Sequence, residues 1–390
     1  MTTLGHDRGR LRVLHIGKFV PPPQGGIELH IDTLLRCLQP HVDCALLAAE
    51  SPQPHARAIF PYPVYTVSSW GRLNSVTLSP GILRAARRLL RPGGFDILHI
   101  HVPNPWADLI ALLAPPQLPV VMTWHSDIVR QRILYKSYRY IQRAAIARAN
   151  HIVLPTPLHL RASAQLDADR VAARATFIPY GIDTAALAAE HASPAAAQRI
   201  AQWAAQRPII LTIGRHVYYK GYEYLLQAMT HLRSPAVLLM IGAGPLTPTL
   251  QAQAADLGIA DRVAFWGEVP KPDLLAALHA CDVFTLPSTE PAEAFGLASA
   301  EAMACAKPVV ACDMGNGINY LHQHGQTSLL VPRRDPVALA AALDRLCVDP
   351  VLRRRLGQQA QARIRQNFSL PSMTQGMLDV YRRVLDHQSL

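Results

Sequence analysis

The chain of 390 residues lacks the long apolar runs of a membrane protein, because polar residues and prolines interrupt every apolar stretch before it reaches 18 residues. The first ten residues also lack the apolar core of a secretory signal peptide. These two absences predict a cytoplasmic protein without a transmembrane helix.

Cysteine and charged residues are both scarce, and each of these shortages excludes some classes of protein. None of the six cysteines belongs to a Cys-x-x-Cys pair or has the spacing of a zinc site, so we expect six buried thiols in a reducing compartment. Charged residues make up 17% of the chain against 50% apolar residues, and this ratio excludes intrinsic disorder. The length predicts two or three globular domains.

Acidic residues are too few to balance the basic ones. The chain has 27 Asp and Glu against 38 Lys and Arg, a net charge of +11, of which residues 1–190 carry +8. Such an excess suits a phosphate-rich partner, which leaves nucleic acid, an anionic membrane and a phosphorylated substrate open beside plain solvated helix faces. The excess gathers in two clusters, Arg84, Arg87, Arg88 and Arg91, then Arg130, Arg132, Lys136, Arg139, Arg143 and Arg148.

Short runs rich in β-branched residues alternate with longer amphipathic stretches along the chain. One series of expected strands extends from Leu11–Ile16 to Ala175–Ile178, and a second from Pro208–Ile213 to Val309–Cys312. Most of these runs lack polar alternation, which is typical of sheets covered on both faces. Because strands and helices alternate, the fold class is α/β with parallel sheets.

Two such series predict two doubly wound, Rossmann-like domains. We expect an N-terminal, acceptor-side domain over residues 1–190 and a C-terminal, nucleotide-sugar-binding domain over 191–369, with an amphipathic helix at 370–390 that packs back on the first domain. Ligands of doubly wound sheets bind beyond the carboxyl ends of the strands. The functional residues are therefore expected at these ends.

The most informative stretch is residues 286–304, where a strand, a loop and a helix follow one another. Glu293 lies in the loop, and the helix is expected to begin at Phe295-Gly296-Leu297, where unpaired amides and the missing side chain of Gly296 suit a phosphate. Glu301 would then lie roughly 9 Å along the helix axis. Because each carboxylate can accept a pair of hydroxyls, this arrangement fits a nucleotide sugar.

Two further motifs suit phosphate groups. Arg215 follows an expected strand and Lys220 precedes a helix, so the two cations can bind one diphosphate, although solvated loop cations are the plain alternative. The pair Gly25-Gly26 precedes the first helix and lets a ligand approach the backbone. The Gly-x-Gly-x-x-Gly spacing of dinucleotide-binding dehydrogenases does not follow the first expected strand.

Taken together, these residues resemble a known family. The stretch 293–304 resembles the Glu-x7-Glu signature of retaining glycosyltransferases of the GT-B fold, family four (glycosyltransferase group 1). The resemblance implies two domains that face a deep cleft, and transfer of a hexose from a nucleoside-diphosphate sugar with retained anomeric configuration. Further motifs follow the family's order: Gly25-Gly26, Thr123–Asp127, Gly214-Arg215 with Lys220, Ile241–Leu246 and Ala264–Gly267.

The resemblance also implies a role for each matched residue. The first glutamate of the signature approaches the donor sugar and the second holds the nucleotide ribose, while the N-terminal glycine pair lies close to donor phosphates and acceptor. The histidine of the Thr123–Asp127 motif lies near the transferred sugar, with a structural histidine as the alternative. The expected catalytic residues are His125, Glu293, Arg215 and Lys220, and the donor-binding residues are Gly25, Gly26, Arg215, Lys220, Phe295, Gly296, Leu297 and Glu301.

No metal and no cofactor are expected. Asp167-Ala-Asp169 mimics a metal motif but lies in a polar turn, and the pairs His99/His101 and His322/His324 have no third ligand at suitable spacing in the sequence. Cations and backbone amides would instead stabilise the charge that builds on the leaving diphosphate.

Residues 123–131 resemble enzymes that add mannose- or rhamnose-type sugars during bacterial surface-polysaccharide assembly. This resemblance favours GDP-mannose as donor, then a UDP-hexose, and a glycan or polyprenyl-diphosphate-linked acceptor. The basic N-terminal half then fits peripheral contact with the anionic inner face of the plasma membrane, and no nucleic acid. The alternatives are a non-catalytic nucleotide-sugar-binding protein and a transferase that uses a UDP-hexose on a small-molecule acceptor.

Overall fold

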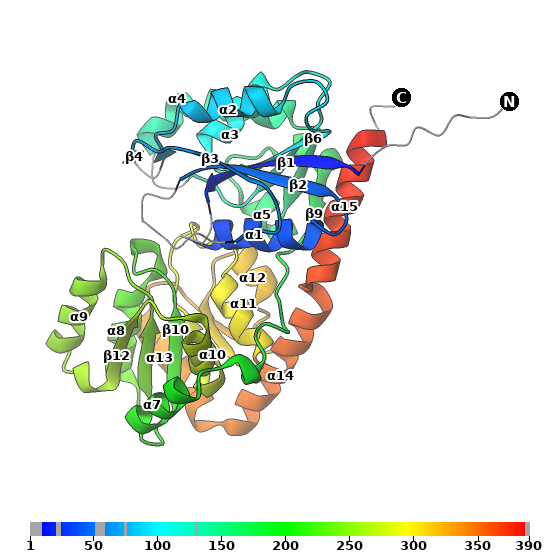
Figure 1. Ribbon diagram of the computed structural model, residues 1–390. Coiled ribbons are helices and arrows are strands. Elements are labelled where there is room, and N and C mark those ends of the chain that lie inside the picture. Colours follow the sequence, from blue (N-terminus) through cyan, green and yellow to red (C-terminus); the bar gives the residue numbers. More distant parts are fainter. Residues whose placement is uncertain (1–9, 21–24, 51–58, 74–75, 129–131, 387–390) are drawn as a thin grey trace. The chain divides into compact units, whose positions relative to one another are not determined.

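The computed structural model describes residues 10–20, 25–50, 59–73, 76–128 and 132–386. The chain divides into two compact units (Figure 1). The first unit contains Met1–Gly181 and Leu370–Leu390, and the second contains Ile182–Ser369.

The first unit is built on a seven-stranded parallel sheet with strand order β3-β2-β1-β6-β7-β8-β9. Its strands are β1 (Arg12–Phe19), β2 (Asp43–Ala49), β3 (Val64–Val67), β6 (Ile97–Val102), β7 (Val120–Trp124), β8 (His151–Leu154) and β9 (Ala175–Phe177), and a separate two-stranded sheet joins β4 (Arg72–Leu73) to β5 (Val76–Thr77). Its helices are α1 (Gly26–Leu38), α2 (Gly81–Leu89), α3 (Pro105–Leu113), α4 (Arg132–Arg148), α5 (Pro157–Ala162), α6 (Ala168–Val171), the short 3-10 helix η1 (Ala172–Arg174) and α15 (Leu370–Asp386).

Helices cover both faces of this sheet, which explains its nearly continuous apolar strands. Alternate residues of β1 point to opposite faces, so Leu14 packs with α2, α3 and α4, whereas Val13 packs with α1 and α15 (Figure 1). In α15, Met373, Met377 and Tyr381 recur every four residues and are buried on one side of the helix. The last helix is therefore part of the first unit's core.

The second unit has a six-stranded parallel sheet with order β12-β11-β10-β13-β14-β15. Its strands are β10 (Ile209–Ile213), β11 (Val237–Ile241), β12 (Val263–Gly267), β13 (Val283–Leu286), β14 (Val309–Cys312) and β15 (Ser328–Val331). Its helices are η2 (Ala189–His191), α7 (Pro194–Ala204), η3 (Tyr218–Lys220), α8 (Tyr222–His231), α9 (Thr247–Asp256), η4 (Ala260–Arg262), α10 (Lys271–Ala280), α11 (Leu297–Ala304), α12 (Gly317–Leu321), α13 (Pro336–Val348) and α14 (Pro350–Asn367).

The predicted fold class is confirmed, because both sheets are parallel, doubly wound and covered by helices. In each sheet the strand order reverses beside the first strand, between β1 and β6 and between β10 and β13. Ligands of doubly wound sheets bind at the carboxyl ends of the strands that flank such a switch point. Among the described helices, none is both long and apolar enough to cross a membrane.

The cysteine prediction is wrong for two residues. All six cysteines are free thiols, but only Cys44, Cys281, Cys312 and Cys347 are buried. Cys37 and Cys305 are partly exposed; Cys37 lies in α1 next to the exposed Arg36, and Cys305 is the residue that follows α11.

Candidate functional site

The switch point of the second sheet holds a buried ion pair. Lys220 lies in η3 after β10 and Glu293 lies in the loop after β13; Nζ of the lysine is 2.5 Å from Oε2 of the glutamate, and each side chain is 11% exposed. Ser288 donates a hydrogen bond of 3.0 Å to the same carboxylate oxygen, and Asn316 donates one of 2.9 Å to the Glu293 carbonyl. Two of the predicted catalytic residues are thus in contact.

A glycine allows these two loops to approach each other. Gly221, directly after Lys220, has φ +66°, and a Cβ at this position would lie 2.2 Å from the carbonyl oxygen of Pro287. A backbone hydrogen bond of 2.9 Å from Thr289 to Tyr219 holds the loops together. Any side chain at residue 221 would therefore separate the lysine from the glutamate.

The electrostatics of the pair keep Lys220 charged. Burial alone would lower the pKa of Lys220, but the Glu293 carboxylate and the hydroxyl groups of Tyr222 and Tyr219 raise this pKa above its ordinary value. A permanent ammonium group at a strand end can bind an anion that competes with the carboxylate.

Two other residues that the sequence predicts for donor binding, Arg215 and Glu301, are also in the second unit. Arg215 is exposed directly beyond β10, and a Cβ at Gly214 would lie 3.2 Å from the Lys220 ammonium. Glu301 lies in α11, where its Oε1 is 3.3 Å from Nζ of Lys271.

The predicted start of the glutamate-bearing helix is wrong by two residues. Helix α11 begins at Leu297 and not at Phe295, because Gly296 adopts a left-handed conformation with φ +81°. A Cβ on Gly296 would lie 2.8 Å from the side chain of Leu286. Phe295 is buried, and its ring centroid lies 5.9 Å from that of Phe368.

In the first unit the predicted glycine pair opens helix α1. Gly25 is the extended residue before the helix and Gly26 is its first residue. Glu28 in the first turn is buried, and its Oε2 would lie 3.3 Å from a Cβ on Gly25. The start of this loop, residues 21–24, lies outside the described residues.

His125 follows β7 in the first unit and is buried. Its Nδ1 shares a hydrogen bond of 2.5 Å with the Tyr180 hydroxyl, and its Nε2 shares one of 3.1 Å with Nδ1 of His101. Both ring nitrogens are thus bonded within the unit. Burial and the neighbouring His30 lower the pKa of His125 well below its ordinary value, so the ring is neutral.

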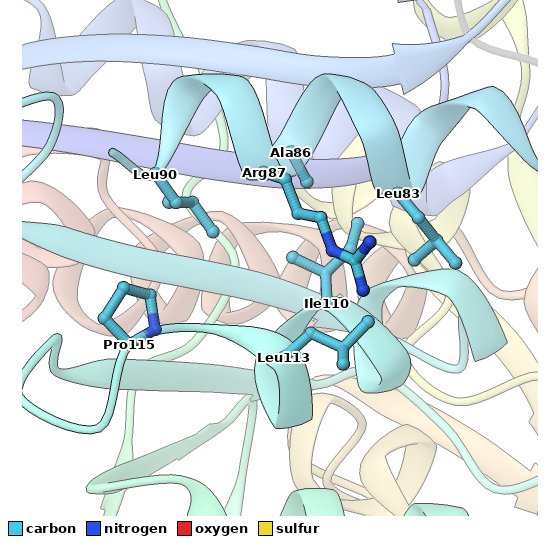
Figure 2. Close-up of a pocket in the computed structure, with 7 residues that line it drawn as sticks. All are labelled: Leu83, Ala86, Arg87, Leu90, Ile110, Leu113 and Pro115. Atoms are coloured by element: carbon cyan, nitrogen blue, oxygen red, sulfur yellow. The ribbon is translucent and has the colours of Figure 1, made fainter. Parts of the chain in front are cut away.

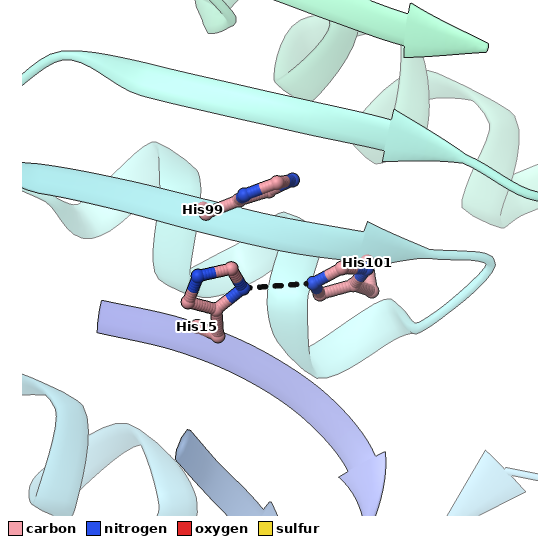
Figure 3. A group of neighbouring side chains, drawn as sticks. All are labelled: His15, His99 and His101. Carbon is pink, nitrogen blue, oxygen red and sulfur yellow. Dashed lines mark hydrogen bonds between the residues drawn. The ribbon is translucent and has the colours of Figure 1, made fainter. Parts of the chain in front are cut away.

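The sequence missed a third histidine beside the pair His99/His101. His15 on β1 is the register partner of His99 on β6, and ligand atoms of the three rings lie within 4.8 Å of one another (Figure 3). The spacing along the chain could not reveal this group, because strand pairing brings His15 to it. The three residues are the natural candidates for a metal ion, but each of their ring nitrogens already has a hydrogen-bond partner.

The other motifs that mimic metal sites are engaged in helix capping and in hydrogen bonds within the fold. Asp167 caps α6 and accepts a hydrogen bond from the backbone N–H of Arg170, beside Asp169 in the first turn. The buried ring of His322 bonds to Ser299 and Ser328.

Comparison with known proteins identifies the family. A model described as glycosyl transferases group 1 matches residues 195–363, and one described as Glycosyltransferase Family 4 matches residues 24–186. D-rhamnosyltransferase WbpZ of Pseudomonas aeruginosa is 32% identical over 367 residues, which cover 92% of each chain. The chain belongs to the family-4 glycosyltransferases. The predicted family is confirmed.

A second relative and two solved structures are also similar to this glycosyltransferase. O-antigen chain mannosyltransferase C of Escherichia coli is 28% identical over 383 residues, 97% of this chain and 100% of the relative. Sucrose-phosphate synthase of Thermosynechococcus elongatus has a TM-score of 0.81 at 21% identity, over 97% of this chain and 100% of that one. Alr3699/HepE of Anabaena, in complex with UDP-glucose, has a TM-score of 0.76 at 20% identity, over 96% and 100%. These structures confirm the GT-B fold.

A cavity of about 120 Å³ in this glycosyltransferase lies away from the residues described above, between α2 and α3 (Figure 2). Its lining is apolar except for Arg87, and it lies on the sheet face opposite the histidines. The cavity has no group suited to sugar transfer. It is lined by Leu83, Ala86, Arg87, Leu90, Ile110, Leu113 and Pro115.

Proposed function

We propose that this glycosyltransferase moves a hexose from a nucleoside-diphosphate sugar to a hydroxyl of a glycan or lipid-linked acceptor, with retained anomeric configuration, in cell-surface polysaccharide synthesis. The observation that carries the proposal is the buried Lys220–Glu293 pair between the ends of β10 and β13. A buried ion pair is weak evidence for a role in folding stability, because hydrophobic residues at the same two positions often make a protein equally stable or more stable. At a switch point it supplies the charges that a donor requires.

Each charge has a role in the proposed reaction. Lys220 and Arg215 bind the donor diphosphate and stabilise the negative charge that builds there as the glycosidic bond breaks, in place of a divalent metal. When the diphosphate pairs with the ammonium group of Lys220, the Glu293 carboxylate loses this partner. It can then accept hydrogen bonds from hydroxyl groups of the hexose. The acceptor oxygen bonds to the anomeric carbon on the face that the phosphate leaves, so the configuration is retained, and the departing phosphate oxygen takes the acceptor proton.

The remaining assignments follow the family signature. Glu301 holds the ribose, and the backbone at Phe295-Gly296-Leu297 binds the phosphate. In the first unit, Gly25-Gly26 serves the donor phosphates and the acceptor, and His125 serves the transferred sugar.

The relatives support a choice of donor. The rhamnosyltransferase and the O-antigen mannosyltransferase favour a rhamnose- or mannose-type sugar, and with the family resemblance this makes GDP-mannose the first candidate. The UDP-glucose complex of HepE favours a UDP-hexose as the second candidate. A D-inositol 3-phosphate glycosyltransferase of Acidothermus cellulolyticus, 30% identical over 331 residues, which are 78% of this chain and 70% of that relative, supports the alternative of a small-molecule acceptor.

The basic half of the chain favours peripheral contact with the inner face of the plasma membrane. Arg84, Arg87 and Arg88 are exposed on α2, beside the apolar cavity, and Leu113 at the end of α3 is 49% exposed. Cations next to exposed apolar side chains suit a layer of anionic lipid. Arg130 of the second basic cluster lies outside the described residues.

The test is a transfer assay with the full chain, GDP-mannose, GDP-rhamnose and UDP-glucose as donors, and lipid-linked and free acceptors. Arg215→Ala should lower kcat/KM at least about 100-fold, because one group that stabilises transition-state charge is lost. Lys220→Ala should do the same and also lower the unfolding temperature, because Glu293 stays buried without its partner.

Arg345→Ala, which removes an exposed cation of α13 in the second unit, is the matched control and should keep full activity. An Arg215→Ala enzyme within twofold of the wild type would contradict the diphosphate assignment. Donor binding without any turnover would favour the non-catalytic alternative.

A further inference from the structure

Buried side chains of the first unit form one continuous line of hydrogen bonds that passes through four histidines. The line crosses β1, β6 and β7 and ends at the hydroxyl groups of Thr123 and Tyr180. Its bonds are Thr123 Oγ1–His99 Nε2 (2.7 Å), His99 Nδ1–Tyr381 OH (2.7 Å), Tyr381 OH–His15 Nε2 (3.3 Å), His15 Nδ1–His101 Nε2 (3.1 Å), His101 Nδ1–His125 Nε2 (3.1 Å) and His125 Nδ1–Tyr180 OH (2.5 Å).

Strand register builds this line. His15 is paired with His99 and His101 is paired with Thr123, so these side chains share one face of the sheet. The last helix supplies Tyr381, whose hydroxyl bridges His15 and His99. The rings of His99 and His101 stack with centroids 4.6 Å apart.

The four imidazoles are neutral. All four are buried, and burial lowers the pKa of His15 to about 3 and lowers the pKa values of His99, His101 and His125 well below the ordinary range. A neutral imidazole carries one N–H and one bare nitrogen. Each histidine therefore donates to one neighbour in the line and accepts from the other.

This requirement couples the protons of the line. If His125 carries its proton on Nε2, it donates to Nδ1 of His101, which must then carry its own proton on Nε2 and donate to His15. The opposite choice puts all three protons on Nδ1. The three histidines must share one tautomer.

Tyr381 extends the same rule to His99. Its hydroxyl has one proton, so it donates to one histidine and accepts from the other when every group is satisfied. If both histidines donated to it, its own proton would be buried without a partner in the line. Full satisfaction therefore places the protons of all four rings on the same nitrogen.

We propose that His15, His99, His101 and Tyr381 are positioning residues, which couple the tautomer of His125 to the rest of the line and hold its ring in one orientation beside the transferred sugar. The proposal rests on the proposed function, in which His125 serves that sugar. Tyr381 acts from the last helix through two histidines of the line, His15 and His101, and touches no substrate.

The first measurement is the tautomer state. Long-range ¹⁵N–¹H spectra of the full chain labelled with ¹⁵N-histidine should show these four histidines neutral at pH 7, with one common tautomer. Tyr381→Phe removes the bridging hydroxyl, and His125 should then show a mixture of both tautomers. Mixed tautomers among His15, His101 and His125 in the wild type would overturn the proposal.

The second measurement is kinetic. Tyr381→Phe should lower kcat about tenfold per folded enzyme molecule and leave the donor KM within twofold. The folded fraction of each variant is measured by circular dichroism, because a loss of folded enzyme alone also lowers the apparent kcat at constant KM. Tyr62→Phe is the matched control, because Tyr62 is also buried in this unit but its hydroxyl donates to Asp32, outside the line. It should change neither constant.

The outcomes separate two failures. A wild-type chain that transfers no hexose from any donor contradicts the proposed function. A wild-type chain that does transfer, with an equal kcat in Tyr381→Phe, overturns the positioning role alone.

Discussion

Gly221 decides whether Lys220 and Glu293 can meet. Its positive φ suits glycine, and its missing side chain leaves room for the carbonyl of Pro287. Lys220 and Glu293 follow strands that are neighbours in the sheet, but the distance between the loops that carry them depends on this one residue. The contact is therefore sensitive to a single methyl group.

Gly221→Ala should lower kcat/KM at least tenfold and lower the unfolding temperature by several degrees, because the Cβ forces the loops apart. Gly258→Ala is a matched control with nearly the same φ, +67°, and no atom within 4 Å of its Cβ. It should lose only the roughly 1 kcal/mol that a left-handed alanine costs. Equal kinetic and thermal changes in both variants would show that the contact with Pro287 has no role.

At this scale the sequence predicted the charged residues but not their partners. Lys220 and Glu293 stand in motifs with recognisable spacing. Asn316 and His15 do not, because packing and strand register bring them to partners distant in sequence, whereas Ser288 lies five residues before Glu293 in the same loop.

Helix α2 has a buried apolar side and an exposed basic side. Ile82 and Ala86 are buried, whereas Arg87 and Arg88 in its last turn are exposed. Basic residues in the last turn also suit the negative end of the helix dipole. Helix stability alone accounts for Arg87 and Arg88 in the last turn. A measurement of lipid binding is therefore needed to distinguish a membrane contact from a purely stabilising role.

Arg87→Glu/Arg88→Glu should weaken binding to vesicles that contain phosphatidylglycerol about 30-fold or more, because each basic residue near such a surface contributes about 1 kcal/mol. Co-sedimentation at 0.1 M salt measures this binding. The control Arg354→Glu/Arg355→Glu makes the same change in charge at exposed positions of α14 and should bind as the wild type does. Equal loss in both variants would indicate a response to net charge and not to α2.

Among the strands, the short strands β3, β4, β5 and β15 were not predicted. Strands β3 and β15 have four residues each and lie at sheet edges, and β4 and β5 have two residues each. The start of α11 was misplaced because Gly296 adopts a left-handed conformation with φ +81°, so the helical backbone begins only after it.

On the scale of the whole molecule, each unit has its own core, and α15 ties the end of the chain to the first. The two-sheet architecture could be predicted because buried parallel strands have a distinct composition. The hydrogen-bonded line could not, since its residues lie between positions 15 and 381 and only the folded unit brings them together.

The same unit should be sensitive to acid. Five of its histidines, His15, His30, His99, His101 and His125, are buried with lowered pKa values. In the unfolded chain these histidines have a pKa of about 6.5, so below that pH they bind protons that they do not bind in the folded unit. The free energy of unfolding is therefore fully present above pH 6.5 and is lost as the pH falls toward 3. Asp108 acts in the opposite direction, because burial raises its pKa to about 7.

Between pH 6.5 and 4 the unfolded chain thus binds up to five more protons at the histidines, while the folded unit retains one at Asp108. The unfolded chain therefore binds more protons than the folded unit, and stability falls as the pH falls through this range. Thermal unfolding followed by circular dichroism should therefore show a steep fall in unfolding temperature below pH 6.5. His30→Gln should flatten the fall, whereas His231→Gln, at an exposed position, should not. An unfolding temperature that is the same at pH 5.5 and pH 8 would mean that these rings are protonated in the folded unit, which the shared tautomer forbids.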